Sequence, residues 1–490
     1  MIGFYIGGEP YVAIKDYKLI KDLMKNEATN SRPKLTPFND LRPGGKVLGI
    51  VDKENYDWVP GIIFSRGQTW VEQRRFTLRA LRDFGFGKSS MEDTLLDEVD
   101  KLCEELNKFS GKGIDIGLKM NISVLNSLWA ILTGEKLPLN DPKLLDIVKK
   151  FNDFFGKSSD VNAAVASFFP YPPMIRWSIL KPIRNIMNIN IESLMKSISG
   201  VKEMAIEQIE NHKISSNDDE INDYIDAYFA EMRKQDNNKN SSFYRDRGYY
   251  YLINVLMDLF FAGMETTSTT LTWSFLYLLH HPEMKRKVQN EIDTVNIILL
   301  CKFYVSCSEY HGIHELYIQY SILKQVIGKN RSPRFSDKDD MHYINAFMME
   351  SLRVTSLAHH SVPHYASEDI HIENYIIPKG SGIFPSLIGV MYDPKYFPNP
   401  HEFKPERFIG EDGTFKQDEH VIPFGVGKRY CLGQTLAEKE YFLFLVGILQ
   451  KFDISPAPMQ KLPSYHIDDS SPPNIVRSCP AYQIIFSLRS

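Results

Sequence analysis

A short glycine-rich segment near the carboxyl end constrains the fold of this chain more than any other feature. It reads Phe424-Gly425-Val426-Gly427-Lys428-Arg429-Tyr430-Cys431-Leu432-Gly433, and an apolar helical pattern follows over 437–449. Two glycines allow a tight loop that brings the backbone close to a large ligand. Cys431 stands where the helix should begin, and a helix N-terminus favours the thiolate form, which donates strongly to iron. A lone cysteine is more often a buried apolar side chain, so the flanking residues must decide between these two interpretations.

The rest of the chain predicts a mainly α-helical protein with a small β portion. Apolar residues recur at helical spacing over 70–81, 95–109 and the long stretch 249–281. Strand patterns are confined to 4–14, 370–377, 382–388 and 481–488, whereas 211–240 reads as exposed loops around one more helix. At roughly 150 residues per domain the length suggests about three domains, but large single-domain enzymes depart from that rule, and the chain has no internal repeat.

Composition argues against several classes of function. The net charge of −4 gives no basic footprint for nucleic acid. The five cysteines are scattered and form no disulfide framework, which favours a reducing, intracellular compartment. They show no C-x-x-C pattern, which argues against a structural zinc site. Asp258 and Glu265 interrupt the stretch 249–281, so we interpret it as a buried helix and not as a membrane span.

The residues around Cys431 fit the pattern F-x-x-G-x-R-x-C-x-G without exception. This segment resembles the haem-binding loop of the cytochrome P450 superfamily, the haem-thiolate monooxygenases. The resemblance implies the cytochrome P450 fold enclosing haem b, with Cys431 as the axial thiolate. The loop residues that it places against the haem are Phe424, Gly425, Arg429, Cys431 and Gly433.

A second motif resembles the family's E-x-x-R pair. Glu350 and Arg353 are spaced to share one helix face, where they can form an ion pair. Arg407, in Pro405-Glu406-Arg407-Phe408, completes the resemblance to the Glu–Arg–Arg cluster that braces the haem pocket. Taken alone, the pair would be read as solvated.

Polar residues in the middle of the long apolar helix require partners, because unsatisfied polar groups there are costly. The resemblance implies that Glu265 and Thr266 form the acid–alcohol pair that stabilises bound dioxygen and relays protons. It also places Ala262 and Gly263 against the haem, with Gly263 leaving room for dioxygen and substrate. The alternative is an ordinary helix kink.

Cationic groups must meet the two haem propionates, because buried carboxylates need partners. Trp70 and Arg74 match the family's W-x-x-x-R, and Arg429 is a second candidate. His364 is a third, with a plain loop histidine as the alternative interpretation.

The resemblance spans nearly the whole chain and implies a monooxygenase that hydroxylates or epoxidises a lipophilic small molecule. Electrons would come from NADPH through a separate reductase, since no G-x-G-x-x-G with a suitable acidic residue is present. NADPH-cytochrome P450 reductase is the expected partner, with cytochrome b5 as a second donor, and the expected docking residues are basic: Arg75, Arg79, Arg82, Lys428 and Lys439. The alternatives are an oxygen-independent haem-thiolate isomerase or dehydratase, and a haem-binding but catalytically impaired product of an incomplete gene model.

In detail the chain resembles the animal microsomal branch and looks arthropod-like. Members of that branch act on xenobiotics, steroids, fatty acids or sesquiterpenoids. We expect the substrate pocket to be lined by Phe260, Phe261, Ala262 and the segments 357–362 and 43–64, and roofed by Phe168, Phe169 and Trp177.

Two departures from the family pattern stand out. Microsomal members begin with a membrane anchor and lie on the cytosolic face of the endoplasmic reticulum. This chain starts at the first strand pair, so we expect residues 1–490 to be a cytochrome P450 domain that lacks the N-terminal membrane anchor, with a truncated gene model preferred to a soluble protein. Residues 296–325 continue neither neighbouring pattern, and we interpret them as an insertion, a retained intron being preferred to a real surface loop.

Overall fold

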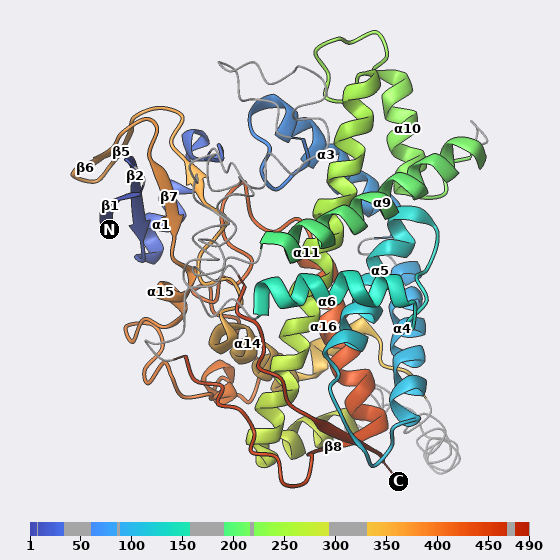
Figure 1. The fold of residues 1–490 in the computed structure, drawn as a ribbon. Helices are drawn as coiled ribbons and strands as arrows, with labels where there is room; N and C mark the ends of the chain where they lie inside the picture. Colours follow the sequence, from blue (N-terminus) through green and yellow to red (C-terminus); the bar gives the residue numbers. More distant parts are fainter. Residues whose placement is uncertain are drawn as a thin grey trace, which may run out of the picture.

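Helices make up most of the chain in the computed structural model, which describes residues 1–6, 8–33, 60–85, 89–156, 191–215, 220–293, 331–467 and 476–489. The longest, α11 (Arg245–His280), runs through the middle of the molecule (Figure 1). The other helices are α1 (Tyr17–Leu23), η1 (Glu27–Thr29), α3 (Gly67–Asp83), α4 (Ser89–Asn107), α5 (Gly117–Thr133), α6 (Pro142–Gly156), α9 (Ile191–Ser215), α10 (Tyr224–Lys234), η4 (Phe335–Asp340), α14 (His342–Thr355), α15 (Leu387–Met391), η5 (Pro405–Phe408) and α16 (Gln434–Lys451).

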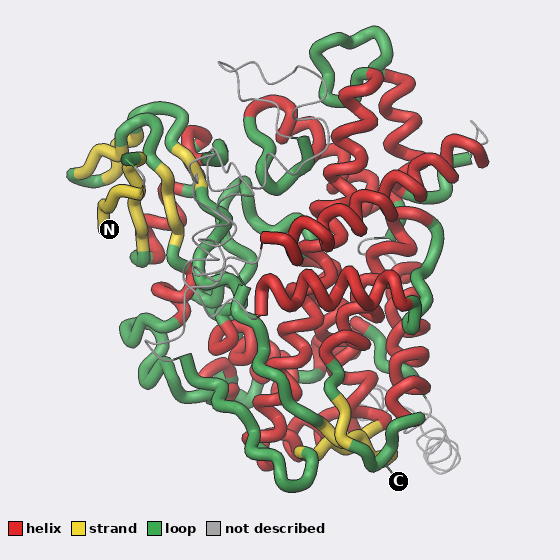
Figure 2. Tube along the Cα trace, in the orientation of Figure 1, coloured by secondary structure: helices red, strands yellow, loops and turns green. Residues whose placement is uncertain are grey.

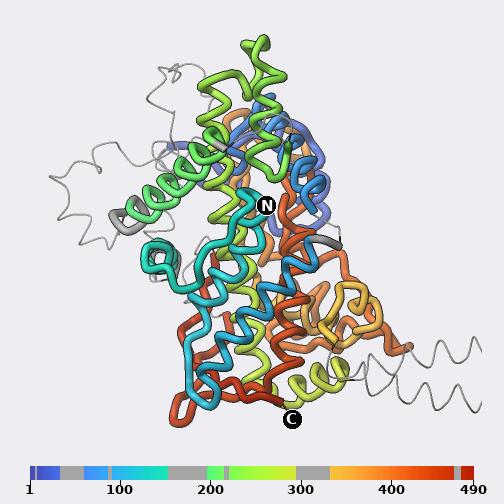
Figure 3. The backbone as a smooth tube through the Cα atoms, turned by 90° about the vertical axis from the view of Figure 1, so that its right-hand side faces the viewer, coloured from blue at the N-terminus to red at the C-terminus, as the bar shows by residue number. Residues whose placement is uncertain are grey.

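Helix α11 forms the centre of the larger hydrophobic core. It is apolar on nearly all sides and contacts α5, α9, α14 and α16, as a helix without a solvent face must. Figure 3 shows α11, α16 and α4 running alongside one another. The prediction of a buried helix over 249–281 is therefore confirmed, as are the helices predicted over 70–81, 95–109 and 437–449. None of the described helices has the length and hydropathy that a bilayer crossing requires.

The main sheet lies to one side of the helices and has the order β1-β2-β7-β4 (Figure 2). Its strands are β1 (Ile2–Ile6), β2 (Glu9–Ile14), β4 (His364–Tyr365) and β7 (Gly382–Pro385), and only the β2–β7 pair is parallel. A second hydrophobic core joins this sheet to α1 and α15. Strand β3 (Gly113–Ile114) pairs with β9 (Ile484–Leu488), which also pairs with β8 (Phe452–Pro456) at the other end of the molecule.

Two of the strand predictions need correction. The segment 370–377 is a hairpin of β5 (Ile370–Ile372) and β6 (Tyr375–Ile377), because Glu373 between them has a φ of 50° and reverses the chain. The segment 382–388 is a strand only to Pro385. The Ser386 side chain then accepts a hydrogen bond from the Gly389 N–H and starts α15.

Candidate functional site

A cavity of about 920 Å³ lies between the helical core and the main sheet. Its wall combines α11 with the loop 424–433 that carries Cys431, called the cysteine loop below. The segments 357–364 and 62–63 and residues of the β portion such as Phe4 and Phe384 complete it. Among the sequence-predicted residues, the lining includes Trp70, Arg74, Ala262, Gly263, Thr266, His364, Phe424, Gly425, Arg429, Cys431 and Gly433. Segments far apart in the chain thus meet around one cavity.

The cysteine loop makes a tight turn beside the C-terminal end of α1. Gly425 and Gly427 have φ values of 71° and 80°, and a Cβ at Gly427 would lie 2.2 Å from the carbonyl oxygen of Met24. The Cys431 N–H donates to the Phe424 carbonyl oxygen over 2.9 Å, which closes the loop just before α16. These contacts explain why only glycine fits position 427 and how the loop holds the Cys431 side chain in the cavity wall.

The pKa of the Cys431 thiol reflects opposing influences. Burial, the largest influence, raises it, while the N–H groups of Gly433 and Gln434 and the charge of Arg74 lower it. The helix N-terminus therefore favours the thiolate, as expected, but burial outweighs it in the chain alone.

Helix α11 contributes Ala262, Gly263 and Thr266 to the cavity wall. Thr266 faces the cavity, and its hydroxyl donates to the Ala262 carbonyl oxygen over 2.7 Å. Gly263 also packs closely against α5, a contact that the sequence did not reveal. A Cβ at this position would lie 2.6 Å from Leu128 Cδ2. Glycine at this position therefore lets α5 approach α11, in addition to leaving space in the cavity.

Glu265 lies on a different side of α11 from Thr266. It is buried and absent from the described cavity lining, and its carboxylate accepts hydrogen bonds from Asn121 Nδ2 of α5 over 3.0 Å and from Thr269 Oγ1 over 2.9 Å. Burial raises the pKa of Glu265 to about 7, and these two hydrogen bonds oppose that rise. A carboxyl group in this range can take up and release protons near neutral pH.

Three buried or half-buried arginines gather on one side of the cavity. Arg32, Arg74 and Arg429 all line it, and burial is the main cause that lowers the pKa of each. In the described chain these arginines donate to backbone carbonyl oxygens, and Arg429 and Arg74 also lie over the rings of Trp70 and Tyr430. Such a cluster is suited to a ligand that carries negative charge.

Two further groups fit the same ligand. The indole Nε1 of Trp70 is buried in the wall without a hydrogen-bond partner in the described chain. The His364 ring shares a hydrogen bond of 2.7 Å between Nδ1 and the Thr29 carbonyl oxygen, and burial lowers its pKa well below the usual range. With the Cys431 thiol, these groups fit haem b, which presents an iron for sulfur and two carboxylates for cationic and N–H donors.

The Glu–Arg–Arg cluster lies behind this wall. Glu350 Oε2 accepts from Arg353 Nε over 2.7 Å, and Glu350 Oε1 accepts from Arg353 Nη2 over 2.8 Å and from Arg407 Nε over 3.0 Å. The Glu350 and Arg353 side chains are fully buried. Arg353 also donates to the carbonyl oxygens of Met391, Pro400 and Glu402, so the cluster ties α14 to the segment that leads to η5.

Several expectations about the pocket and surface need correction. Phe260 packs edge-on against Trp129 and Phe261 stacks on Phe151, so neither belongs to the described cavity lining. Lys439 is buried, with its ammonium 5.1 Å from the centre of the Phe335 ring, and cannot form part of an exposed docking face. Three other expectations concern residues that the structure does not describe. They are the pocket lining over 43–59, the roof residues Phe168, Phe169 and Trp177, and the suspected insertion 296–325.

Sequence reasoning missed three residues of the site. Arg32 lies in the cavity wall, Asp258 accepts hydrogen bonds from the N–H groups of Ile62 (2.7 Å) and Ile63 (3.0 Å), and Asn121 contacts Glu265. The sequence shows Asp258 as an acidic residue within an apolar stretch. A buried carboxylate needs hydrogen-bond donors, and this need was the signal for a contact with another segment of the chain.

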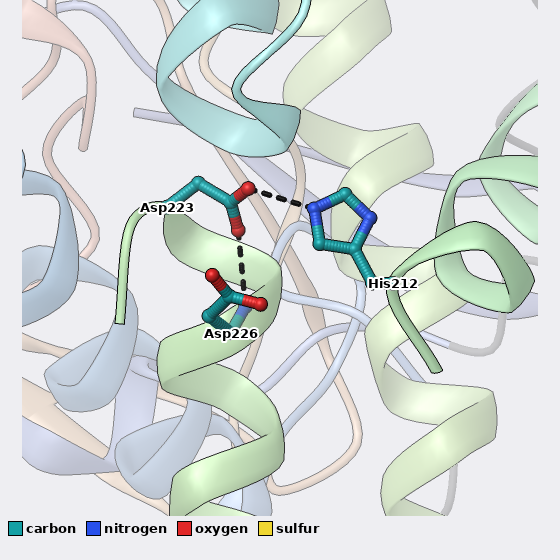
Figure 4. A group of neighbouring side chains, drawn as sticks. All are labelled: His212, Asp223 and Asp226. Atoms are coloured by element: carbon teal, nitrogen blue, oxygen red, sulfur yellow. Dashed lines mark hydrogen bonds and ion pairs between the residues drawn. The ribbon is translucent and has the colours of Figure 1, made fainter. Parts of the chain in front are cut away.

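A cluster of titratable side chains lies outside the cavity (Figure 4). His212 Nε2 lies 2.7 Å from Asp223 Oδ2, and Asp223 Oδ1 accepts from the Asp226 N–H over 3.0 Å. The hydrogen bond to Asp223, the largest cause, raises the pKa of His212 to about 9. Since Asp223 caps the N-terminus of α10, this cluster is a His–Asp pair that joins α9 to α10.

Comparison with known proteins identifies the family of the chain. The family model for cytochrome P450 matches residues 1–296 and 321–486. Cytochrome P450 2C28 of Mesocricetus auratus is 31% identical over 98% of this chain and 86% of that protein. Cytochrome P450 2E1 of Oryctolagus cuniculus is 32% identical over 92% of this chain and 80% of that protein.

A third relative, cytochrome P450 2B2 of Rattus norvegicus, is 32% identical over 88% of this chain and 77% of that protein. These relatives are mammalian, so the arthropod-like character remains a prediction. The matches extend over nearly the whole chain, and the described residues form a mainly helical fold with a small β portion. The chain belongs to the cytochrome P450 family and is a haem-thiolate monooxygenase of the animal microsomal type, with haem b as its cofactor.

Proposed function

We propose that this monooxygenase hydroxylates or epoxidises a lipophilic small molecule, with electrons that pass from NADPH through a separate reductase. The observation that carries the proposal is that the Cys431 thiol and the Thr266 hydroxyl line one cavity whose wall is otherwise largely apolar. Leu128, Leu259, Met348, Leu357 and Phe384 contribute to that wall. Apolar linings of this kind suit xenobiotics, steroids, fatty acids and sesquiterpenoids, which remain the proposed substrate classes.

The residues of the cavity have distinct proposed roles. Cys431 would be the iron ligand, and when bound the haem supplies the activation of dioxygen. Trp70, Arg74, Arg429 and His364 would hold the carboxylates of the haem. Phe424, Gly425, Gly433, Ala262 and Gly263 would pack against it, and Glu350, Arg353 and Arg407 would brace the wall behind them.

Thr266 and Glu265 would handle protons. The Thr266 hydroxyl donates to the Ala262 carbonyl oxygen and lines the cavity, and its oxygen can still accept a hydrogen bond. Glu265 would serve as the proton reservoir, since burial raises the pKa of its carboxyl to about 7. Asn121 and Thr269 fix that carboxyl against α5.

The electron donor would approach the exposed basic residues. Arg75, Arg79 and Arg82 on α3 and Lys428 beside the cysteine loop are exposed, although Arg79 pairs with Glu231 over 3.5 Å and Lys428 pairs with Glu27. A positive face of this kind favours an acidic partner such as NADPH-cytochrome P450 reductase, with cytochrome b5 as a second donor. The relatives support a place on the cytosolic face of the endoplasmic reticulum membrane.

Residues 296–325 are proposed to be a dispensable insertion in a domain that spans 1–490. The family match supports this, because it stops at residue 296 and resumes at residue 321. Chains with and without 296–325, expressed side by side, should fold and bind haem with equal or better yield when the segment is removed. A loss of haem binding on removal would show that the segment is needed.

Turnover with NADPH and purified reductase tests the function. Product that carries one oxygen atom from ¹⁸O₂ and disappears without reductase is the expected result. An isomerase or dehydratase would give product without oxygen or reductase, and a catalytically impaired protein would bind haem and give no product. The Thr266 hydroxyl in the cavity wall supports the monooxygenase over both alternatives.

A further inference from the structure

His360 is a polar side chain of the cavity wall that no motif includes and to which the roles proposed above assign no task. It lies in the segment 357–364 and lines the cavity next to Phe384 of β7, on the side of the main sheet. The His360 ring meets the Phe384 ring edge-on, with 6.2 Å between the ring centres. An imidazole in a largely apolar wall is costly without a hydrogen-bond partner, so its position there needs an explanation.

The backbone around His360 is held against the sheet. His360 forms an isolated antiparallel bridge with Ser386, which directly follows β7. The Ser361 N–H donates to the Pro385 carbonyl oxygen over 3.1 Å. These contacts fix the position from which the ring borders the cavity, so a ligand would meet a preorganised group.

The ring nitrogens of His360 are not engaged in the described chain. Nδ1 is buried without a hydrogen-bond partner there, and burial is the one cause that shifts the pKa of the ring. The polar neighbours in the same segment do have partners. Ser361 Oγ donates to the Val362 carbonyl oxygen over 3.3 Å, and His364 Nδ1 shares a hydrogen bond of 2.7 Å with the Thr29 carbonyl oxygen. His360 therefore keeps its hydrogen-bonding capacity for a ligand.

The protonation state of the ring determines which ligand atom it can bind. Burial lowers the pKa of His360 below its usual range, so the ring is neutral near neutral pH and carries a single N–H. A buried N–H without an acceptor is rarer in proteins than an unpaired acceptor, so we expect the proton on Nε2 and not on the buried Nδ1. A neutral N–H donor in an apolar wall favours an uncharged acceptor oxygen, since a carboxylate beside it would lack a counter-charge. The carbonyl oxygen of an ester or a ketone meets this requirement.

We propose that His360 is a specificity-determining residue that donates a hydrogen bond to a carbonyl oxygen of the substrate, and that neutral lipophilic esters or ketones are the preferred substrate class. This inference rests on the function proposed above and narrows its substrate classes. The carbonyl group would lie on the sheet side of the cavity, and the rest of the molecule would extend along the apolar wall towards Thr266. A simpler role is that His360 only packs against Phe384.

The test titrates the haem-loaded full chain with methyl laurate, laurate and pentadecane and follows the Soret band. Methyl laurate and pentadecane have the same number of non-hydrogen atoms and differ in the ester group. The measured quantity is the ratio of the two affinities, because the cost of removing each molecule from water cancels between variants. H360L should lower the ester-to-alkane ratio about threefold to tenfold, the size of one hydrogen bond between neutral groups. H360Q, which retains an N–H donor, should keep the ratio of the wild type.

His359 offers a matched control. It is the neighbouring histidine, its Nε2 is buried and unpaired in the described chain, and burial lowers its pKa to about 4, but it is not in the described cavity lining. H359L should change the affinities for the ester and the alkane by the same factor. If H360L behaves like H359L, His360 only packs against Phe384 and the inference is overturned.

The other outcomes separate the inference from the proposed function. If H360L weakens the binding of laurate more than that of methyl laurate, the ring binds a carboxylate and the inference is overturned in that form. A wild type whose Soret band responds to none of these probes overturns it as well. A wild type that binds methyl laurate but yields no oxygenated product with NADPH and reductase contradicts the proposed function, whereas the affinity ratio still decides the role of His360. Should H360L fail to fold, H360F, which also lacks an N–H donor, replaces it with the same expected ratio.

Discussion

Truncation of Arg353 is the perturbation whose effect the structure defines best. The R353M variant keeps the length of the side chain but removes every N–H donor. Glu350, which is fully buried, would then have only the Arg407 Nε at 3.0 Å and the Lys404 N–H at 2.8 Å as partners. The carbonyl oxygens of Met391, Pro400 and Glu402 would each lose a donor as well.

The expected cost follows from the buried Glu350 carboxylate, which loses one of its two arginine partners. Breaking a buried ion pair by removing one partner costs about 3–5 kcal/mol. Native domains are stable by only about 5–15 kcal/mol, so R353M should lose about a fifth or more of the free energy of unfolding. Equilibrium unfolding in urea, followed by circular dichroism, measures this as a lower midpoint at an unchanged slope.

Two further variants test whether the loss of stability comes from the buried charge of Glu350. E350L combined with R353M removes the buried negative charge and should be more stable than R353M alone, because Arg407 is partly exposed and can remain hydrated. K416M, in the exposed pair Lys416–Asp412, should leave the midpoint unchanged. The reasoning is refuted if R353M lies within about 1 kcal/mol of the wild type, or if the double variant is no more stable than R353M.

Three other predictions concern protons. T266V should bind haem and substrate normally but yield less product for each NADPH oxidised, which a stoichiometric assay measures; unchanged stoichiometry would exclude the hydroxyl from proton handling. Burial raises the pKa of Glu265 to about 7, so ionisation should destabilise the fold as the pH rises from about 4.5 through 7. E265Q should therefore be more stable than the wild type at pH 8 by about 3 kcal/mol and similar at pH 4, in urea unfolding; equal stability at both values would contradict the burial argument. The hydrogen bond to Asp223 raises the pKa of His212 to about 9 from 6.5, so its contribution is complete below pH 6.5 and is lost as the pH rises through 9. H212Q should flatten the pH dependence of the unfolding midpoint in that window, and an unchanged slope would show that the pair does not stabilise the α9–α10 junction.

The motif-bearing residues could be predicted because each motif is local. The order of glycine, arginine and cysteine in 424–433 and the spacing of Glu350 and Arg353 are visible in a few residues of sequence. Hydrophobic periodicity likewise located α3, α4, α11 and α16. The exact ends of the strands were harder to predict from the sequence, because the change from β7 to α15 depends on a single hydrogen bond of the Ser386 side chain.

Contacts between distant segments could not be predicted in the same way. Arg32 reaches the cavity because η1 lies beside β4 and the segment 62–63, and nothing in the spacing of Ser31, Arg32 and Pro33 indicates this. The direction of Glu265 depends on Asn121 of α5, a helix for which no site residue was proposed. The sequence predicts Lys439 on a basic docking face, but the packing of α16 buries this side chain beside Phe335.

The carbon-monoxide difference spectrum of the reduced protein tests the central claim most directly, because the position of its Soret band reports whether a thiolate is the iron ligand. We predict a strongly red-shifted Soret band for the full chain, and an unshifted carbon-monoxide band for C431H, which replaces the thiolate with an imidazole. The unshifted band in the wild type, or the red-shifted band in C431H, would contradict the assignment of Cys431 as the haem ligand.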